Sequence, residues 1–328
     1  FQTDPSVLMI AEESTAWPKV SHPVSEGGLG FNLKWNMGWM NDVLHYMKLD
    51  PYFRQFNHRD ITFSFMYAFS ENFILPLSHD EVVHMKGSLL NKMPGTYEEQ
   101  FHGVRAFYTY MLTHPGKKLL MMGSEFGQWN EWHYEHSLDW HLLELEGEDG
   151  DRHRALKAFF QAVNAFYLAH PELWELDFSW EGFEWISNDD YKQSVIAFRR
   201  KAKDGRELVA VCNFVPVQRE NYCIGVPIRG TWAEVFTSDA KEFGGGVTNG
   251  SAIKTQDVPM HGCDQSISLT LPGCSVFFLE CVKKPPKRAR RTTAAKTEST
   301  TKTTRTTKKA STAGKTGTTS RAKGKKAQ

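Results

Sequence analysis

A short apolar run leads directly into a polar, acidic cluster in the stretch Phe73-Ile74-Leu75-Pro76-Leu77-Ser78-His79-Asp80-Glu81. Similar apolar runs lie at residues 7–11, 31–35 and 118–122, and each of them also ends in polar or glycine-rich sequence. Short apolar runs of this kind are typical of buried parallel strands rather than of strands with one face in water. We therefore expect four buried parallel strands within the first 125 residues.

Helical patterns separate these runs. The clearest spans residues 97–114, where apolar side chains recur at helical spacing until Pro115 and Gly116 end the pattern. Another spans residues 152–170 and stops at Pro171. Strands that alternate with helices in this way predict an α/β fold with right-handed crossovers.

The periodicity changes near residue 180. Short strand-like segments separated by turn sequences follow at residues 182–187, 193–199, 207–214, 231–237, 266–271 and 275–282. This pattern predicts an all-β antiparallel sandwich domain over residues 181–282, after an α/β domain over residues 1–180.

The charge of the chain is divided unevenly along its length. The 328 residues hold 39 basic and 38 acidic side chains, for a net charge of +1, but residues 283–328 hold 16 of the basic side chains and one of the acidic ones. Residues 1–282 therefore carry 23 basic and 37 acidic side chains, or −14, against +15 for residues 283–328. The basic segment has no aromatic residue, Ile or Leu, so we expect a disordered tail that cannot bury a core.

The composition argues against several classes of protein. No apolar run approaches the roughly 18–20 residues that a membrane-spanning helix needs, and the first residues show no secretion signal. The five cysteines are odd in number and form no C-x-x-C pair, which favours free thiols in a reducing compartment such as the cytoplasm. Because the chain begins with Phe1 rather than Met, we expect it to start within a longer protein.

Carboxylates follow two of the apolar runs. Glu12 and Glu13 come directly after the first run, and Asp80 follows the third. The carboxyl ends of parallel strands meet at one edge of a sheet, so these groups can share a cleft. Paired carboxylates in such a cleft suit glycoside chemistry, in which one acts as general acid and another as nucleophile or charge stabiliser. The alternative is that Glu12 and Asp80 only cap the helices that follow them.

Aromatic side chains lie near the same strand ends. Trp35 and Trp39 flank the end of the second run, and residues 128–132 place two tryptophans beside amide and carboxylate groups after the fourth. Such combinations line sugar-binding clefts, but large aromatic side chains at these positions also serve as ordinary core residues.

Five segments together resemble the glycogen branching enzymes, a family of the alpha-amylase superfamily of (β/α)8-barrel enzymes; they are residues 9–15, 31–40, 75–84, 123–129 and 137–140. The segment Lys34–Met40 is specific to that family within the superfamily. The resemblance runs from Phe1 to about Val282 and stops at the tail. It implies the second half of a (β/α)8 barrel (a TIM barrel), followed by an all-β carboxy-terminal domain.

The resemblance also implies roles for individual residues. Glu12 would be the acid/base, with Glu13 as its neighbouring alternative, and Asp80 would stabilise the transition state. His79 would bind substrate hydroxyls, and Trp35 and Trp39 are further expected substrate contacts. The substrate would be an α-1,4-glucan such as glycogen, the product an α-1,6 branch, and no metal or organic cofactor would be needed.

The sequence departs from the family pattern in two ways. Met85, Ser124 and His133 stand where the family has other residues, which affects details of specificity. More importantly, the Arg-x-Asp segment that carries the superfamily's nucleophile is absent from the sequence. A retaining mechanism needs that nucleophile, so we expect the 328 residues alone not to branch amylose.

Four other classes of protein compete with this interpretation, including a nucleic-acid-binding protein that the basic tail suggests. One is a glycoside hydrolase of the same superfamily, and another is a half-barrel that binds glucan without catalysis. The third is a metal-dependent enzyme that uses the closely spaced His133, His136, Asp139 and His141, although their spacing fits no standard zinc pattern.

The basic tail generates a test of its own. A solvated extension is the simplest interpretation, and the alternative is nonspecific binding of polyanions through counterion release. If the tail is only solvated, deleting residues 283–328 leaves DNA binding unchanged in a salt titration. A loss of salt-sensitive binding on deletion would instead assign polyanion binding to the tail.

Overall fold

The first part of the chain builds a four-stranded parallel sheet. The computed structural model describes residues 4, 6–247 and 252–283. Its strands β1 (Ile10–Ala11), β2 (Leu33–Trp35), β3 (Phe73–Leu77) and β4 (Lys117–Leu120) pair in sequential order, and every pairing is parallel. The third apolar run therefore coincides with β3, whose five residues are all buried. The predicted tail, apart from Lys283, lies outside the described residues.

The prediction that the first run is a buried strand is wrong. Val7, Leu8, Met9 and Ile10 are exposed, and only Ile10 and Ala11 form β1. β1 lies at an edge, where β2 is its one partner within the described part of the chain. A parallel strand is buried only when it is covered on both faces and paired on both sides, and β1 lacks that cover here.

Helices follow the strands. α1 (Met37–Lys48) and α2 (Pro51–Arg54) come after β2, α3 (Tyr97–Thr113) after β3, and α4 (Gly147–Ala169) after β4. α3 confirms the predicted helix, and Thr96 and Glu99 form a capping box at its start. α4 begins five residues before its predicted start, and Glu148 and Asp149 stabilise its first turn through the helix dipole.

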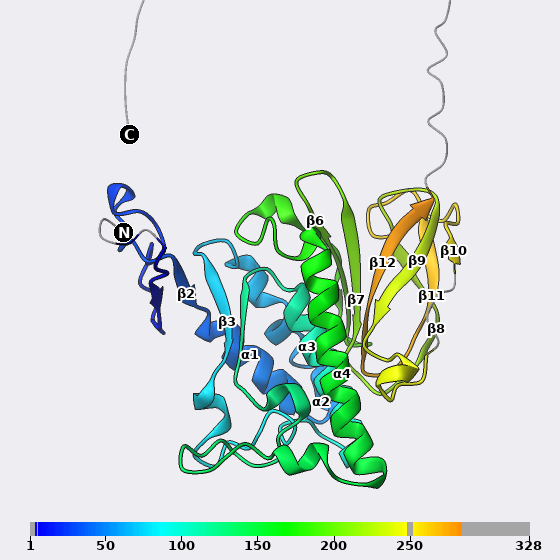
Figure 1. Ribbon diagram of the computed structural model, residues 1–328. Coiled ribbons are helices and arrows are strands. Elements are labelled where there is room, and N and C mark those ends of the chain that lie inside the picture. Colours follow the sequence, from blue (N-terminus) through cyan, green and yellow to red (C-terminus); the bar gives the residue numbers. More distant parts are fainter. Residues whose placement is uncertain (1–3, 5, 248–251, 284–328) are drawn as a thin grey trace, which may run out of the picture. The chain divides into compact units, whose positions relative to one another are not determined.

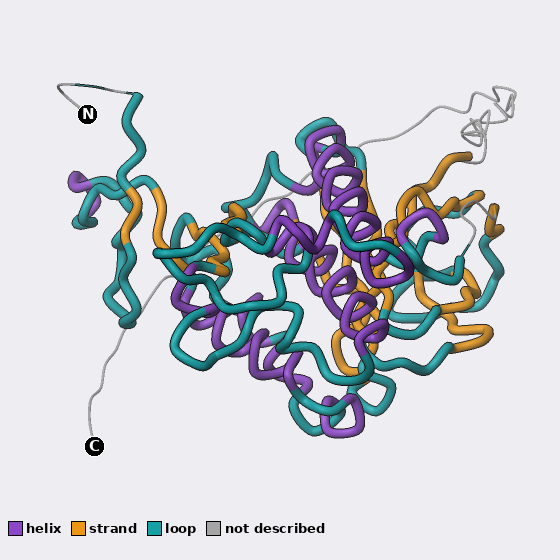
Figure 2. Tube along the Cα trace, turned by 60° about the horizontal axis from the view of Figure 1, so that its bottom comes forward, coloured by secondary structure: helices purple, strands orange, loops and turns teal. Residues whose placement is uncertain are grey.

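Short 3-10 helices occupy many of the connections, at Val24–Glu26, His58–Ile61, Phe63–Met66, His79–Val82, Ser124–Phe126, Trp140–Leu143, Pro171–Leu173, Trp180–Gly182 and Lys241–Phe243. In Figure 1, α1, α3 and α4 lie between the parallel strands and the antiparallel strands of the second part. Figure 2, turned from that view, shows the N-terminal residues projecting from the side of the molecule opposite the antiparallel strands.

The second part is all-β and antiparallel, as predicted. Its strands are β5 (Phe183–Asp190), β6 (Val195–Lys201), β7 (Glu207–Asn213), β8 (Arg219–Gly225), β9 (Thr231–Thr237), β10 (Ala252–Lys254), β11 (Ser266–Leu271) and β12 (Ser275–Lys283). Six of them form a sheet in the order β10-β9-β12-β7-β6-β5, and β11 pairs with β8. A buried cluster that includes Val209, Ile224 and Ile267 draws on strands of both sheets.

Two of these strands are absent from the sequence-based prediction. β8 contains Arg219, Glu220 and Asn221, and β10 has only three residues, so neither shows the apolar alternation that identifies a strand. Both form through pairing with a distant partner, β11 and β9 respectively. Local sequence carries little of that information.

The described residues of the two parts pack into one compact unit. A continuous apolar core joins α1, α3 and α4 to β7 and β12. Phe166 of α4, for example, stacks on Phe278 of β12 with 5.1 Å between ring centroids. The change from parallel to antiparallel pairing falls between β4 and β5, and the predicted boundary near residue 180 remains a prediction.

A buried ion pair crosses this junction. Arg200 of β6 donates to the Asp177 carboxylate at 2.8 Å, and both side chains are almost completely buried. Arg200 also donates to the backbone oxygens of Thr113 (2.6 Å) and Gly182 (3.1 Å), and Lys117 of β4 reaches Asp177 at 3.0 Å. Burial alone would raise the pKa of Asp177, but the nearby cations outweigh burial and hold that pKa below its ordinary value.

Within the described residues, no helix combines the length and the apolar character needed to cross a bilayer.

We predict that Asp177→Asn lowers the free energy of unfolding by about 3–5 kcal/mol at neutral pH, because it leaves the Arg200 charge buried and uncompensated. Since the folded-state pKa of Asp177 is depressed, the stabilisation is present above its unfolded pKa of about 3.9 and is lost as pH falls through the folded value. Urea unfolding at several pH values measures this.

The matched control is Asp151→Asn, which removes the exposed partner of Arg154 in α4. Exposed pairs contribute little, so no measurable change is expected. Equal stability of the two variants would contradict the role assigned to Asp177.

Candidate functional site

The candidate residues follow one edge of the parallel sheet. Glu12 comes one residue after β1, Trp35 is the last residue of β2, and Asp80 lies three residues after β3. Because the strands are parallel, all three positions belong to the carboxyl edge of the sheet. Glu12 is exposed and is neither hydrogen-bonded nor ion-paired within the part of the chain that the structure describes.

A capping box shapes the turn after β3. Ser78 begins the turn, and the buried Glu81 accepts hydrogen bonds from the Ser78 backbone N–H (2.6 Å) and hydroxyl (2.8 Å). Ser78 and Glu81 thus form the hydrogen bonds that cap the start of the 3-10 helix His79–Val82. Asp80 is therefore not needed as the cap of this helix. The Asp80 carboxylate is about half exposed, and its Oδ1 lies 3.2 Å from Nε2 of His79.

Two side chains from later in the sequence hold the loop beyond Asp80. The buried Lys92 ammonium donates to the backbone oxygens of Glu81 (2.5 Å), Lys86 (2.7 Å) and Gly87 (2.6 Å). The Glu131 carboxylate accepts from the backbone N–H groups of Met85 and Gly87.

The surroundings of Lys92 and Glu131 shift the pKa of both side chains. Burial lowers the pKa of Lys92 to about 8. The two backbone donors lower the pKa of Glu131. Glu131 is the carboxylate of residues 128–132, but its bonds to this loop are not predictable from sequence, and a lysine twelve residues after Asp80 is a weak signal without the loop geometry.

A cavity of about 520 Å³ opens beside Asp80. α1 forms one wall, and the loop after β3 forms the other, so that the lining residues are Met37, Met40, Asn41, Leu44, His45, Lys48, Asp80, Glu81, Lys86 and Lys92. Asp80 therefore faces a recess large enough for a small ligand.

The two neighbouring glutamates after β1 differ in their surroundings. Glu13 forms an ion pair with Lys34 of β2 at 2.7 Å and accepts the Thr15 backbone N–H at 2.7 Å. The Lys34 hydrogen bond is the largest cause that lowers the pKa of Glu13 to about 2. A carboxyl group held ionised in this way is a poor general acid, which leaves Glu12 as the better candidate of the two.

No helix begins at Glu12. Residues 12–17 have no helical turn, so the alternative that Glu12 caps a following helix finds no support in the structure.

The two tryptophans occupy different environments. Asn36 caps α1 by accepting the Trp39 backbone N–H at 2.9 Å, which turns the Trp39 ring into the core against Phe107 and His114. The ring is fully buried. The prediction that Trp39 contacts substrate is therefore wrong, because helix α1 places this position on its inner face. Trp35 is half-buried at the strand end.

The histidine cluster after β4 does not assemble a metal site. The rings of His133 and His136 lie 4.7 Å apart, while Asp139 accepts the Asn130 backbone N–H instead of joining them. Across the described residues, no group of three or more His, Cys, Asp or Glu side chains is placed to hold a metal ion. Trp132 of the same segment contacts the His79 ring edge-on, with 6.0 Å between centroids.

Comparison with known proteins identifies relatives along most of the chain. The model of the alpha amylase C-terminal all-beta domain matches residues 185–282. The 1,4-alpha-glucan branching enzyme GlgB of Aquifex aeolicus is 53% identical over 282 residues, which are 85% of this chain and 44% of that protein. The GlgB of Halothermothrix orenii is 52% identical over the same shares. The chain thus spans less than half the length of these relatives.

Solved structures show the same fold at low identity. Type I pullulanase from Bacillus subtilis, complexed with maltose, matches with a TM-score of 0.53 and 13% identity over 85% of this chain and 40% of the pullulanase. A cyclomaltodextrinase matches with a TM-score of 0.54 and 17% identity, covering 85% of this chain and 41% of that protein.

The ion pair at β1 generates a testable difference between the two glutamates. We expect the Glu13 carboxyl to titrate near pH 2, as measured by carbon NMR of selectively labelled glutamate. Lys34→Met removes the main cause of this shift, so the Glu13 pKa should then return toward its ordinary value of about 4.3. Lys19→Met, on a lysine that binds the Glu26 backbone oxygen instead, is the matched control. An unchanged Glu13 titration in Lys34→Met would refute the assignment.

Proposed function

We propose that the chain belongs to the 1,4-alpha-glucan branching enzyme family and supplies the acid/base part of a retaining transglycosidase. The reaction cleaves an α-1,4-glucan such as glycogen and transfers the released segment to a 6-hydroxyl, which creates an α-1,6 branch. The observation that carries the proposal is 53% identity to the Aquifex aeolicus relative over 282 of the 328 residues.

Glu12 performs the proton transfers in this proposal. It first donates a proton to the glycosidic oxygen that leaves, and then removes the proton from the incoming 6-hydroxyl. Its carboxyl group is exposed and has no partner among the described residues, so it can approach a substrate, whereas Glu13 is held by Lys34.

Asp80 and His79 act on the sugar itself. The Asp80 carboxylate stabilises the positive charge that develops on the ring in an oxocarbenium-like transition state. His79, 3.2 Å from Asp80, donates a hydrogen bond to a substrate hydroxyl. Trp35 offers a partly exposed aromatic face at the end of the neighbouring strand.

The parallel sheet then forms the second half of a (β/α)8 barrel. Its four sequential parallel strands, of which β2, β3 and β4 are followed by α-helices, support this assignment. A complete barrel takes about 250 residues, whereas residues 1–180 hold four strands. In the proposal, the remaining strands and the nucleophile come from the length that the curated relatives have beyond the match, and the exposed β1 edge pairs with a strand from that part.

We also propose the bounds of the domains and the cellular setting. Residues 1–180 form the half-barrel and residues 181–282 the carboxy-terminal domain, with residues 283–328 as a basic extension. The relatives are 1,4-alpha-glucan branching enzymes, and the proposed setting is glycogen biosynthesis in the cytoplasm.

The test compares the 328-residue chain alone with the same chain joined behind the upstream part of the Aquifex aeolicus relative. We expect no branching of amylose by the chain alone, because the nucleophile is missing. The joined protein should branch amylose, and Glu12→Gln should lower that rate by at least ~100-fold. Proton NMR counts α-1,6 linkages, and a reducing-end assay counts hydrolysis.

Glu26→Gln is the matched control, since Glu26 is an exposed glutamate outside the site, and its activity should equal that of the parent. Branching by the chain alone, or full activity of Glu12→Gln, would overturn the proposal. Release of reducing ends without α-1,6 linkages would identify a hydrolase instead.

A further inference from the structure

The loop that follows the turn at Asp80 has a strained backbone. His84 (φ 56°), Met85 (φ 66°) and Gly87 (φ 74°) all lie in the left-handed region, which brings the Cβ of an ordinary residue too close to the following carbonyl oxygen. The Met85 side chain is 98% exposed, so its own packing does not hold it there. Contacts from outside the loop must therefore stabilise this conformation. We call residues 83–87 the strained loop.

Lys92 supplies the central support of the strained loop. Its ammonium group donates to the backbone oxygens of Glu81 at 2.5 Å, Lys86 at 2.7 Å and Gly87 at 2.6 Å, which lie before the loop and at its end. An ammonium group has three N–H donors and no acceptor, and all three are used on this backbone. Lys92 therefore has no donor left for a substrate hydroxyl, and it acts through the loop.

Two routes carry this support to Asp80. Lys86, whose backbone oxygen is bound by Lys92, donates its own ammonium group to the backbone oxygen of Asp80 at 2.6 Å. Glu81, the next residue after Asp80, is bound by Lys92 through its backbone oxygen and closes the capping box with Ser78 through its side chain. The backbone of Asp80 is thus held by contacts that lead back to Lys92.

A segment after β4 holds the other side of the strained loop. The Glu131 carboxylate accepts the backbone N–H groups of Met85 at 3.0 Å and Gly87 at 2.6 Å. Trp132 donates its backbone N–H to the oxygen of Val82, just before the loop, at 2.9 Å. The ammonium group thus binds the oxygens of this backbone, and the carboxylate binds its N–H groups.

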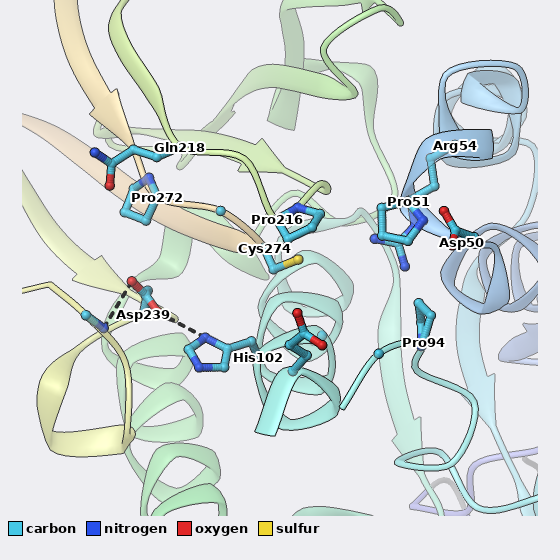
Figure 3. Close-up of a pocket in the computed structure, with 15 residues that line it drawn as sticks. Asp50, Pro51, Arg54, Pro94, His102, Pro216, Gln218, Asp239, Pro272 and Cys274 are labelled. Atoms are coloured by element: carbon cyan, nitrogen blue, oxygen red, sulfur yellow. Dashed lines mark hydrogen bonds and ion pairs between the residues drawn. The ribbon is translucent and has the colours of Figure 1, made fainter. Parts of the chain in front are cut away.

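The backbone from which Lys92 projects is itself fixed. Met93, the next residue, is buried in the core, and its backbone oxygen accepts from the Gln100 side chain of α3 at 3.0 Å. Pro94 restricts both its own φ and the backbone of Met93. Figure 3 shows Pro94 beside a second cavity, of about 610 Å³, on the same side as Arg54 of α2. The ammonium group therefore reaches the strained loop from a rigid base.

From these contacts we propose that Lys92 is a positioning residue for Asp80: its ammonium group holds the strained loop closed and thereby keeps the Asp80 carboxylate at the cavity that it lines. Glu131 assists from the opposite side of the loop. The inference rests on the proposed function for the role of Asp80 in the reaction.

The charge state of Lys92 should control the strained loop. The charged and titratable groups around it come from three segments, and they are His45 and Lys48 of α1, Asp80, Glu81 and Lys86 after β3, and Glu131 after β4. Burial is the largest cause that lowers the pKa of Lys92 to about 8. The ammonium group is therefore present below pH 8, and it is lost as the pH rises through this value, which removes one donor and the positive charge.

Amide hydrogen exchange of the 328-residue chain, followed by NMR, tests the hold on the strained loop. We expect the amides of Met85 and Gly87 to be protected at pH 7, and this protection, corrected for intrinsic exchange, to fall above pH 8. Lys92→Met should lower the protection at least ~10-fold at pH 7 and abolish the change near pH 8. Lys192→Met, on an exposed lysine between β5 and β6, is the matched control and should behave like the parent.

The carboxyl carbon of Asp80, labelled selectively and assigned by its loss in Asp80→Asn, reports the position of the residue itself. We expect its NMR signal to shift in Lys92→Met and to stay at the parental position in Lys192→Met. An unchanged Asp80 signal or unchanged loop protection in Lys92→Met would rule the proposal out. The pH dependence of the parent needs no substitution, so its absence also rules the proposal out, even if Lys92→Met fails to fold.

Branching of amylose by the joined protein separates this inference from the proposed function. We expect Lys92→Met to lower kcat by ~10- to 100-fold with little change in KM. The ratio of parental to variant rates should fall above pH 8, which a merely structural effect of the substitution does not produce. If Lys92→Met keeps the parental kcat, the proposed function stands and the positioning role is refuted. If the joined protein does not branch at all, the proposed function fails, and the exchange and NMR measurements still decide whether Lys92 holds Asp80.

Discussion

The buried pair of Arg200 and Asp177 is the interaction on which the arrangement of the two parts depends. Arg200 belongs to the antiparallel sheet and Asp177 to the connection before it. Another acceptor of Arg200, the backbone oxygen of Thr113, belongs to the last residue of α3. Lys117, the first residue of β4, also forms an ion pair with Asp177. Two charges are costly to bury unless each is fully paired, so this geometry permits few alternative packings of the β part against α3 and β4.

The buried ion pair also constrains the carboxyl edge of the parallel sheet, where the candidate residues lie. β4 pairs with β3 so that Leu120 stands opposite Leu77, the last residue before the turn that carries Asp80. The end of β3 is thus held by a strand whose own start is tied to the ion pair. The capping box of Ser78 and Glu81 then fixes the turn itself. Rigid support of this kind is what keeps a catalytic carboxylate within the narrow range of positions that chemistry tolerates.

Many of the strands, helices and candidate residues could be predicted from local sequence. The predictions that failed share one physical cause. The apolar run of β3, the period of α3 and the acidic residues after the strands are local signals, and they predict the elements and the positions of Glu12 and Asp80. Burial is not local. Trp39 is in the core because Asn36 starts a helix that points the ring inward, and residues 7–10 are exposed because β1 has a single neighbour within the described chain.

The same reasoning explains the groups that the sequence did not reveal. Lys92 and Glu131 matter because a folded loop brings three backbone oxygens and two backbone N–H groups to them. β8 forms because β11 supplies its partner. Arg54 bridges two parts that lie far apart along the chain, because it donates to the backbone oxygens of Met47 and Phe214.

We propose that Glu12, His79 and Asp80 act on one sugar residue. A crystal structure of the joined protein with maltoheptaose tests this placement. We expect a glucose ring whose glycosidic oxygen lies within hydrogen-bonding distance of Glu12, with Asp80 and His79 beside the same ring. A bound glucan that contacts Asp80 while Glu12 remains in solvent, out of reach of any glycosidic oxygen, would contradict it.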